Sequence, residues 1–177
     1  VDVGVFAHLF DAAGGTLQGE FQVNTITEKD QVGPHVAMAS GGSFVVAWTT
    51  EGQVGSGADV FARQFDASGT GLADDFRVNV TTGQGQQNPA VAIDANGTFV
   101  VSWESSHQDG FSWGIFAQVY DAAGSVLVDE FQVNSNTQGP QIRPDVNANS
   151  DGVAVVVWLG LDAVHHPAVH AQRYILP

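Results

Sequence analysis

A loop that mixes aromatic, amide and carboxylate side chains is the part of this sequence best suited to chemistry. Residues 103–114 read WESSHQDGFSWG. A sugar offers the face of its ring to an aromatic side chain and its hydroxyls to amide and carboxylate groups. The candidates for carbohydrate binding in this loop are Trp103, Gln108, Asp109 and Trp113. We expect Trp113 to be an exposed stacking platform, although a tryptophan folded onto its own sheet fits the sequence equally well.

A second loop of related composition lies earlier in the chain. Trp48 corresponds to Trp103, and Gln53 and Asp59 follow it in a glycine-rich segment. These three residues are further candidates for carbohydrate binding. Because Trp48 and Trp103 end apolar strands, packing between sheets is the favoured interpretation for both. Several weak equivalent sites on one rigid body would give avidity without a deep pocket.

Motifs of enzyme active sites are missing from the sequence. It contains no cysteine, no Gly-x-Ser-x-Gly elbow, no His-Glu-x-x-His pair and no phosphate-binding loop. Acidic residues recur at the start of one strand, at Glu20, Asp74-Asp75 and Asp129-Glu130. Adjacent residues on a strand point to opposite faces, so we expect solvated edge charges at these positions. The sequence therefore predicts a protein that is not an enzyme.

Metal-binding patterns are equally poor. His166 and His170 have a spacing that presents two ligands on one face of a helix, but Pro167 and the strand context disfavour a helix. Calcium takes about six to eight oxygen ligands, usually with several carboxylates. The turns that could supply them carry one aspartate each, at Asp11, Asp66, Asp94 and Asp121. We predict that these aspartates cap their turns and that no metal or cofactor is bound.

The charge of the chain excludes several kinds of partner. The sequence has 19 acidic and 5 basic residues among 177, which gives a net charge of −14. An acidic surface repels phosphate groups, so nucleic acid and anionic membranes are not expected partners. The longest apolar run, Val153–Leu161, is too short to insert across a membrane. The chain starts at Val1 without a leader, and we expect a processed mature protein or an excised fragment.

The sequence repeats itself at a fixed interval. FVVAW at 44–48 recurs as FVVSW at 99–103 and as AVVVW at 154–158. A proline and an asparagine recur with the same spacing, as Pro34, Pro89 and Pro144 and as Asn24, Asn79 and Asn134. The cycles span residues 5–59, 60–114 and 115–168, with a partial fourth at 169–177, and all belong to one repeat domain. Each cycle contains four short strand-like runs separated by turns, which predicts an all-β fold.

The central strand of each cycle is apolar on both faces, and this favours one architecture. A strand of this kind needs a sheet packed against each side. Four-stranded blades of a β-propeller meet that requirement. A three-fold β-trefoil or β-prism is the alternative, because there are three complete cycles. Three blades are about half a ring, so we also expect a head-to-tail homo-oligomer whose exposed strand edges pair between chains.

The repeat resembles one found in large secreted bacterial proteins. The resemblance rests on the second cycle, with FVVSW, QDG, IFAQVYDAAG and EFQVN in order, and it implies a propeller-like fold and an extracellular location. By architecture alone the chain is also similar to propeller lectins of the tachylectin type, which bind N-acetylated sugars. The expectation is therefore a secreted, multivalent lectin for glycans without catalysis. The alternative is a structural or adhesive module without a small ligand.

Overall fold

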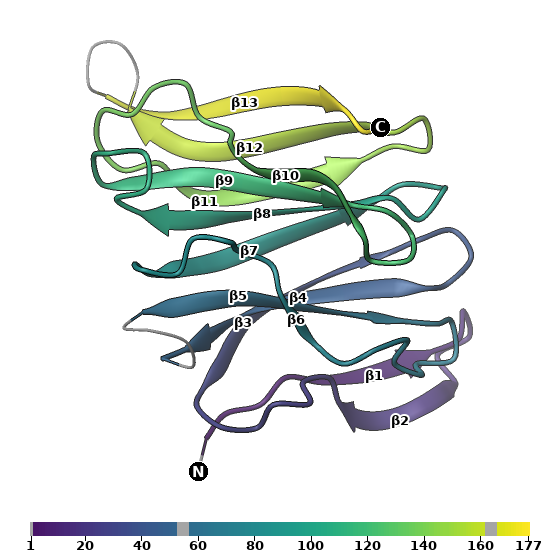
Figure 1. The fold of residues 1–177 in the computed structure, drawn as a ribbon. Coiled ribbons are helices and arrows are strands. Elements are labelled where there is room, and N and C mark those ends of the chain that lie inside the picture. Colours follow the sequence, from purple (N-terminus) through teal and green to yellow (C-terminus); the bar gives the residue numbers. More distant parts are fainter. Residues whose placement is uncertain (1, 53–56, 162–165) are drawn as a thin grey trace.

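The chain folds into a series of antiparallel sheets, shown by a computed structural model that describes residues 2–52, 57–161 and 166–177 (Figure 1). Every regular element within these residues is a strand, and no helix there is long and apolar enough to cross a membrane. The strands are β1 (Phe6–Phe10), β2 (Thr16–Gln22), β3 (Gln31–Met38), β4 (Phe44–Glu51), β5 (Ala58–Phe65), β6 (Phe76–Arg77), β7 (Gln86–Ile93), β8 (Phe99–Ser106), β9 (Trp113–Tyr120), β10 (Val126–Gln132), β11 (Ile142–Ala148), β12 (Val153–Leu161) and β13 (Pro167–Ile175).

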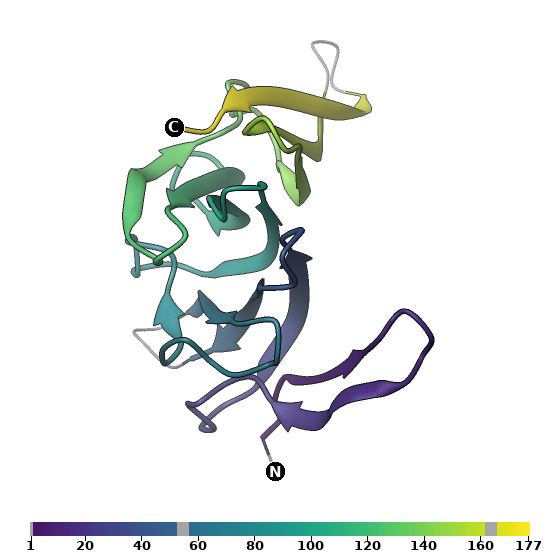
Figure 2. The ribbon, with the colours of Figure 1, turned by 90° about the vertical axis from the view of Figure 1, so that its right-hand side faces the viewer.

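These strands pair in chain order into a hairpin and three larger sheets. We call β1–β2 the first hairpin, β3–β6 blade I, β7–β10 blade II and β11–β13 blade III. Figure 2 shows the hairpin and the blades following one another along an arc, with the first strand of each blade on the concave side. The predicted all-β fold of propeller-type blades is confirmed, and the β-trefoil and β-prism alternatives are not formed. Each sequence cycle joins the last two strands of one sheet to the first two of the next.

The apolar cores lie between neighbouring sheets. Val45 and Ala47 of blade I share one cluster with Trp103 and Phe116 of blade II. Equivalent clusters join the first hairpin to blade I and blade II to blade III. In both β4 and β8 the first seven residues are buried. Strands that are apolar on both faces are thus enclosed by a sheet on each side, as the sequence predicts.

The recurrent asparagines fasten the last strand of the first hairpin, of blade I and of blade II to the strand beside it. Each asparagine Oδ1 accepts a backbone N–H near the start of the neighbouring strand, β1, β5 or β9, at 2.7–2.9 Å. Each asparagine Nδ2 donates to a carbonyl two residues later in the chain. These bonds are made by Asn24, Asn79 and Asn134. The side chains therefore replace ladder hydrogen bonds at a point where the strands separate.

The recurrent prolines lie in the innermost strand of each blade, within a bulge. The pairing register shifts there in β3, β7 and β11. The residues before the prolines, Gly33, Asn88 and Arg143, have φ values of 60°, 52° and 55°. Proline has no N–H to donate to a ladder, so an unpaired inner edge suits it. The bulge turns the backbone N–H groups of Asn88 and Arg143 away from the ladder. Each N–H donates instead to a side chain of the preceding blade.

Candidate functional site

The loop between β8 and β9 and the first residue of β9 carry three of the residues predicted to bind carbohydrate. Trp113 is partly buried, and its ring lies over the connection from blade I to blade II. A Cβ atom added to Gly85 in that connection would lie 3.8 Å from the ring. Trp113 therefore leans on the protein and offers less open surface than a free-standing platform.

Gln108 and Asp109 of the same loop already have partners within the protein. Gln108 donates to Oε1 of Glu130 at 2.5 Å and accepts a hydrogen bond from Ser105 Oγ at 2.6 Å. Asp109 Oδ1 accepts a backbone N–H of its own turn at 3.1 Å, and its Oδ2 accepts from Asn134 Nδ2 at 3.4 Å. These bonds hold the loop against blade II, so a sugar would have to displace them.

Asp59 accepts a hydrogen bond from the recurrent asparagine of blade I, as Asp109 does from that of blade II. Its Oδ1 accepts from Asn79 Nδ2 at 2.7 Å, and the residue is 1% exposed. Burial raises the pKa of the Asp59 carboxyl, although the bond from Asn79 and the charge of Arg77 act in the opposite direction. Asp59 thus positions a strand and is closed to a ligand. The remaining loop candidate, Gln53, lies outside the described residues.

Trp48 and Trp103 are both completely buried. Trp48 packs in the cluster between the first hairpin and blade I, and Trp103 packs between blades I and II. Neither ring has a face open to a sugar, so the structure is inconsistent with carbohydrate stacking on either one. Their predicted role in packing between sheets is confirmed.

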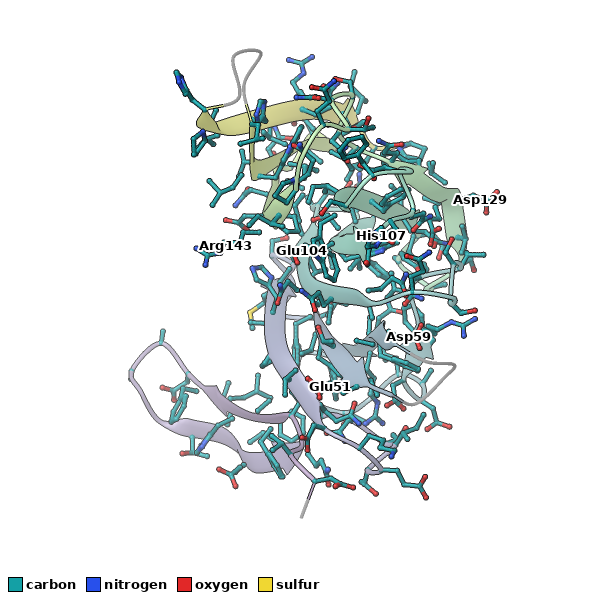
Figure 3. All side chains as sticks on the ribbon, turned by 90° about the vertical axis from the view of Figure 1, so that its left-hand side faces the viewer. Glu51, Asp59, Glu104, His107, Asp129 and Arg143 are labelled. Carbon is teal, nitrogen blue, oxygen red and sulfur yellow. The ribbon has the colours of Figure 1, made fainter. Side chains whose placement is uncertain are left out.

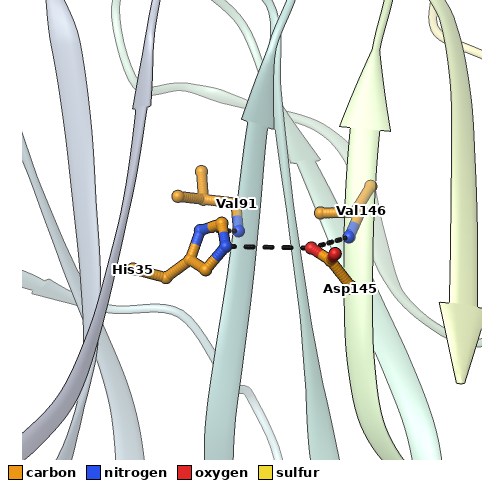
Figure 4. Close-up of polar contacts among 4 residues, drawn as sticks. All are labelled: His35, Val91, Asp145 and Val146. Atoms are coloured by element: carbon orange, nitrogen blue, oxygen red, sulfur yellow. Dashed lines mark hydrogen bonds and ion pairs between the residues drawn. The ribbon is translucent and has the colours of Figure 1, made fainter. Parts of the chain in front are cut away.

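A groove along the inner strands presents polar groups that the loops do not. It is lined by residues 35–38 of β3, 91–93 of β7 and 145–148 of β11, and its volume is about 350 Å³. We call it the inner groove. His35 Nε2 and Asp145 Oδ1 are 3.8 Å apart within it (Figure 4). The backbone N–H of Val91 donates to His35 Nδ1 at 3.2 Å. This bond assigns the proton of the neutral ring to Nε2, the atom facing Asp145.

The Asp145 carboxylate is both fixed and accessible. Its side chain is 71% exposed, and Oδ1 also accepts the backbone N–H of Val146 at 2.9 Å. The His35–Asp145 pair therefore places a donor and an acceptor on the open wall of the inner groove. No group of three His, Asp or Glu side chains in the described part of the chain converges to hold a metal ion.

A buried glutamate joins blades II and III beside this groove. Glu104 is 2% exposed; its Oε1 accepts the backbone N–H of Arg143 at 2.7 Å and its Oε2 accepts from Gln87 Nε2 at 3.0 Å. Figure 3 shows Glu104 and Arg143 on the concave side of the arc. Thr49 makes the equivalent contact between blades I and II, where its hydroxyl oxygen accepts the backbone N–H of Asn88 at 3.1 Å. Glu104 therefore holds the bulge that carries Arg143.

Sequence reasoning did not single out His35, Glu104, Arg143 or Asp145. The signal that could have found them is divergence between the repeats. The residue after the recurrent proline is histidine, alanine or aspartate, and the residue after the recurrent tryptophan is threonine, glutamate or leucine. A charged side chain at a position where another repeat has a small or apolar residue indicates a role specific to that repeat.

The chain is similar in fold to solved structures of carbohydrate-processing enzymes. It matches the Hadza microbial sialidase Hz136 with a TM-score of 0.61 at 14% identity, over 81% of this chain and 35% of that one. It matches the endo-arabinase from Bacteroides thetaiotaomicron with a TM-score of 0.56 at 14% identity, over 94% and 64%. It matches the Penicillium chrysogenum α-L-arabinanase complexed with arabinobiose with a TM-score of 0.63 at 11% identity, over 99% and 56%. No known protein family and no curated protein sequence matches it.

These comparisons correct the functional prediction. A lectin without catalysis, or a module without a small ligand, was expected, but the similar structures are glycoside hydrolases. The prediction that the protein is not an enzyme is wrong for the same reason. The prediction considered contiguous motifs only, whereas polar groups from separate inner strands meet here only in the fold. At 11–14% identity the likeness establishes the β-propeller architecture, and the chain spans only 35–64% of the length of these structures.

Proposed function

We propose that this chain forms part of a carbohydrate-processing enzyme, with the glycan bound in the inner groove beside His35 and Asp145. The observation that carries the proposal is an exposed carboxylate fixed 3.8 Å from an imidazole in a groove of about 350 Å³. Imidazole and carboxylate groups bond sugar hydroxyls as donor and acceptor. The likeness to glycoside hydrolases supports the substrate class.

The chemistry expected of such a site needs two carboxyl groups. Glycoside hydrolysis typically uses a pair about 5–9.5 Å apart on either side of the scissile bond. Asp145 would supply one of them, as nucleophile or as base, and His35 would orient its carboxylate. Both oxygens of Glu104 are already bonded, so its role is to position the bulge at Arg143. We expect the second carboxyl group from inner strands beyond β3, β7 and β11, which form only part of a ring.

The charge of the protein favours a neutral substrate. The net charge is −14, and Asp145 adds a negative group to the groove itself. An anionic sugar would be repelled on approach and again on binding. A neutral polysaccharide such as arabinan, the kind of substrate that the names of two similar structures indicate, fits this charge. A polymeric substrate also agrees with the extracellular location expected from the repeat.

The test is release of reducing sugar from arabinan and from a panel of neutral and anionic aryl glycosides. We expect activity on neutral substrates and a loss of about 100-fold or more in Asp145→Asn, the scale of a lost acid–base group. Asp151→Asn is the matched control, because Asp151 is an exposed aspartate of the same blade outside the groove lining. A parent protein that cleaves no glycoside, or an Asp145→Asn variant with parental activity, would overturn the proposal.

A further inference from the structure

Blade III exposes an apolar face that the other blades bury. The face consists of Val155, Val157 and Leu159 on β12 and Val169 on β13, and we call it the outer face. Val155 and Leu159 are each 38% exposed and Val169 is 73% exposed. The equivalent residues of blade I include Val45 and Ala47, which lie in the cluster with blade II and are at most 1% exposed. The outer face of blade III therefore lacks the neighbouring sheet that covers the equivalent face of blade I.

The opposite end of the arc exposes the kind of apolar surface that such a face contacts. An apolar groove of about 330 Å³ lies between the first hairpin and blade I, and we call it the hairpin groove. Phe44 and Val46 of β4 line it, and Val36 and Met38 of β3 line it with exposures of 57% and 58%. The equivalents of Phe44 and Val46 in blade II, Phe99 and Val101, are covered by the face of blade I that corresponds to the outer face.

We infer that a second copy of this chain covers the hairpin groove with the outer face of its blade III. The contact would repeat the one between blades I and II, with small aliphatic side chains on one side and aromatic ones on the other. A head-to-tail contact of this kind produces either a closed ring or an open filament. Two copies with three blades each would close a ring within the usual range of about four to eight blades. The inner groove, lined here by three strands, would then be completed by the partner.

A second, polar contact repeats along the chain and supports the same arrangement. Asp75 of blade I accepts the hydroxyl of Thr25 and its backbone N–H, the latter at 3.2 Å. Glu130 of blade II accepts the N–H of Val80 at 2.7 Å and the hydroxyl of Thr81 at 2.8 Å. In both cases an acidic residue in the outer strand, or next to it, accepts hydrogen bonds from the connection that leaves the preceding sheet. We call this contact the carboxylate clamp.

A third copy of the clamp has its two parts at opposite ends of the molecule. Glu20 of β2 occupies the repeat position of Asp75 one cycle earlier, and Ser135 occupies the repeat position of Val80 one cycle later. Both residues are exposed, and neither side chain has a partner within the described part of the chain. In the head-to-tail contact, Glu20 of one copy would accept the backbone N–H groups of Ser135 and Asn136 in the other. Glu20 and Ser135 can meet in this way only between two chains.

The strands also fit, with one displacement. β1 and β13 are copies of the same blade strand, so a shared sheet has room for only one of them. β13 pairs with β12 at nine positions without a register shift, whereas β1 pairs with β2 at four positions with two shifts. We therefore expect β13 to keep its place and β1, which forms one wall of the hairpin groove, to move aside. The partner would then cover the wall formed by β3 and β4, and β2 would add to the edge of the partner's β13. Blade III would become four-stranded, like blades I and II.

Because the chain contains no cysteine, engineered cysteines can test this contact. Glu20→Cys and Ser135→Cys are purified separately, mixed and oxidised, and we expect a disulfide-linked heterodimer. The double variant Thr25→Cys/Asp75→Cys places cysteines at an existing clamp, so its disulfide within one chain is the positive control. Asp151→Cys mixed with Glu20→Cys is the negative control, since Asp151 is exposed but lies in a turn away from the clamp.

The oligomeric state gives an independent readout. We expect light scattering to show a dimer or a larger closed assembly of the parent at micromolar concentration. Val155→Asp and Glu20→Lys should each shift it to a folded monomer, whereas Glu28→Lys, a matched exposed control, should leave it assembled. A monomeric parent would overturn the second-copy inference. Equal cross-linking of Glu20→Cys to Asp151→Cys and to Ser135→Cys would overturn it as well.

Discussion

Blades II and III have closely related sequences but different surroundings. Val100 of blade II and Val155 of blade III occupy the same repeat position and differ in exposure, at 2% against 38%. Seven consecutive residues of β8 are buried, whereas β12 alternates between more and less buried residues. The difference arises because blade II has a sheet on both sides and blade III has one on a single side. A strand that is apolar on both faces therefore predicts a sheet packed against each face. Whether both faces are buried depends on whether the second sheet is present.

The largest effect should come from placing a charge at this repeat position in each blade. Val100→Asp would bury a carboxylate without a partner and should lower the free energy of unfolding by more than about 3 kcal/mol. In the single chain, Val155→Asp should lower it by less than about 1 kcal/mol, because the side chain reaches water there. Urea denaturation followed by tryptophan fluorescence, at a protein concentration low enough that the chain is monomeric, measures both values. Equal losses under these conditions would show that the outer face of blade III is covered within the single chain.

A smaller contrast separates two tryptophans at the same repeat position. Trp158 Nε1 donates to Gln141 Oε1 at 2.9 Å, whereas the buried Nε1 of Trp103 has no partner in the described part of the chain. Gln86, which corresponds to Gln141, instead donates to Ser105 Oγ at 3.3 Å. Trp158→Phe should therefore cost about 1 kcal/mol more than Trp103→Phe, since only the former leaves a buried acceptor without its donor.

The same denaturation experiment measures this contrast. Both substitutions remove a similar volume from a core between blades, so the lost packing largely cancels in the comparison. Equal costs would mean that Gln86 turns to bond Trp103 in solution, and that the two blades do not differ at this position.

The sequence predicted the scaffold far better than the candidate site, for a physical reason. The recurrent Trp48, Trp103 and Trp158 mark strands whose burial depends on period and polarity alone, and these are visible in one dimension. The pairing of His35 with Asp145 depends on blades I and III placing their inner strands on either side of β7. The two residues belong to different cycles of the repeat, and neither is part of a recognisable motif. The loop candidates stood out by their composition, but Gln108, Asp109 and Asp59 make hydrogen bonds within their own blades.

Two aspartates of blade I provide the smallest contrast between a buried and an open position. Burial raises the pKa of Asp59 above its ordinary 3.8, with Asn79 and Arg77 opposing the shift. The Ser68 hydroxyl and then backbone N–H groups of its turn lower the pKa of the partly exposed Asp66. A raised carboxyl pKa means that the folded state disfavours the charged form, so stability falls as the pH rises from 3.8 through the folded value. A lowered pKa means that stability is present above 3.8 and is lost as the pH falls through the folded value.

Asparagine substitutions should therefore have opposite pH dependences at these two positions. Relative to the parent, Asp59→Asn should gain free energy of unfolding as the pH rises above 3.8, and Asp66→Asn should lose it as the pH rises through the interval just below 3.8. Asparagine keeps the shape and one oxygen of the side chain but cannot titrate, so the difference isolates the charge. Urea denaturation in a series of buffers from acidic to neutral pH measures both differences. A pH-independent difference for Asp59→Asn would show that water reaches the Asp59 carboxylate, and the contrast between buried and open positions would then fail at this residue.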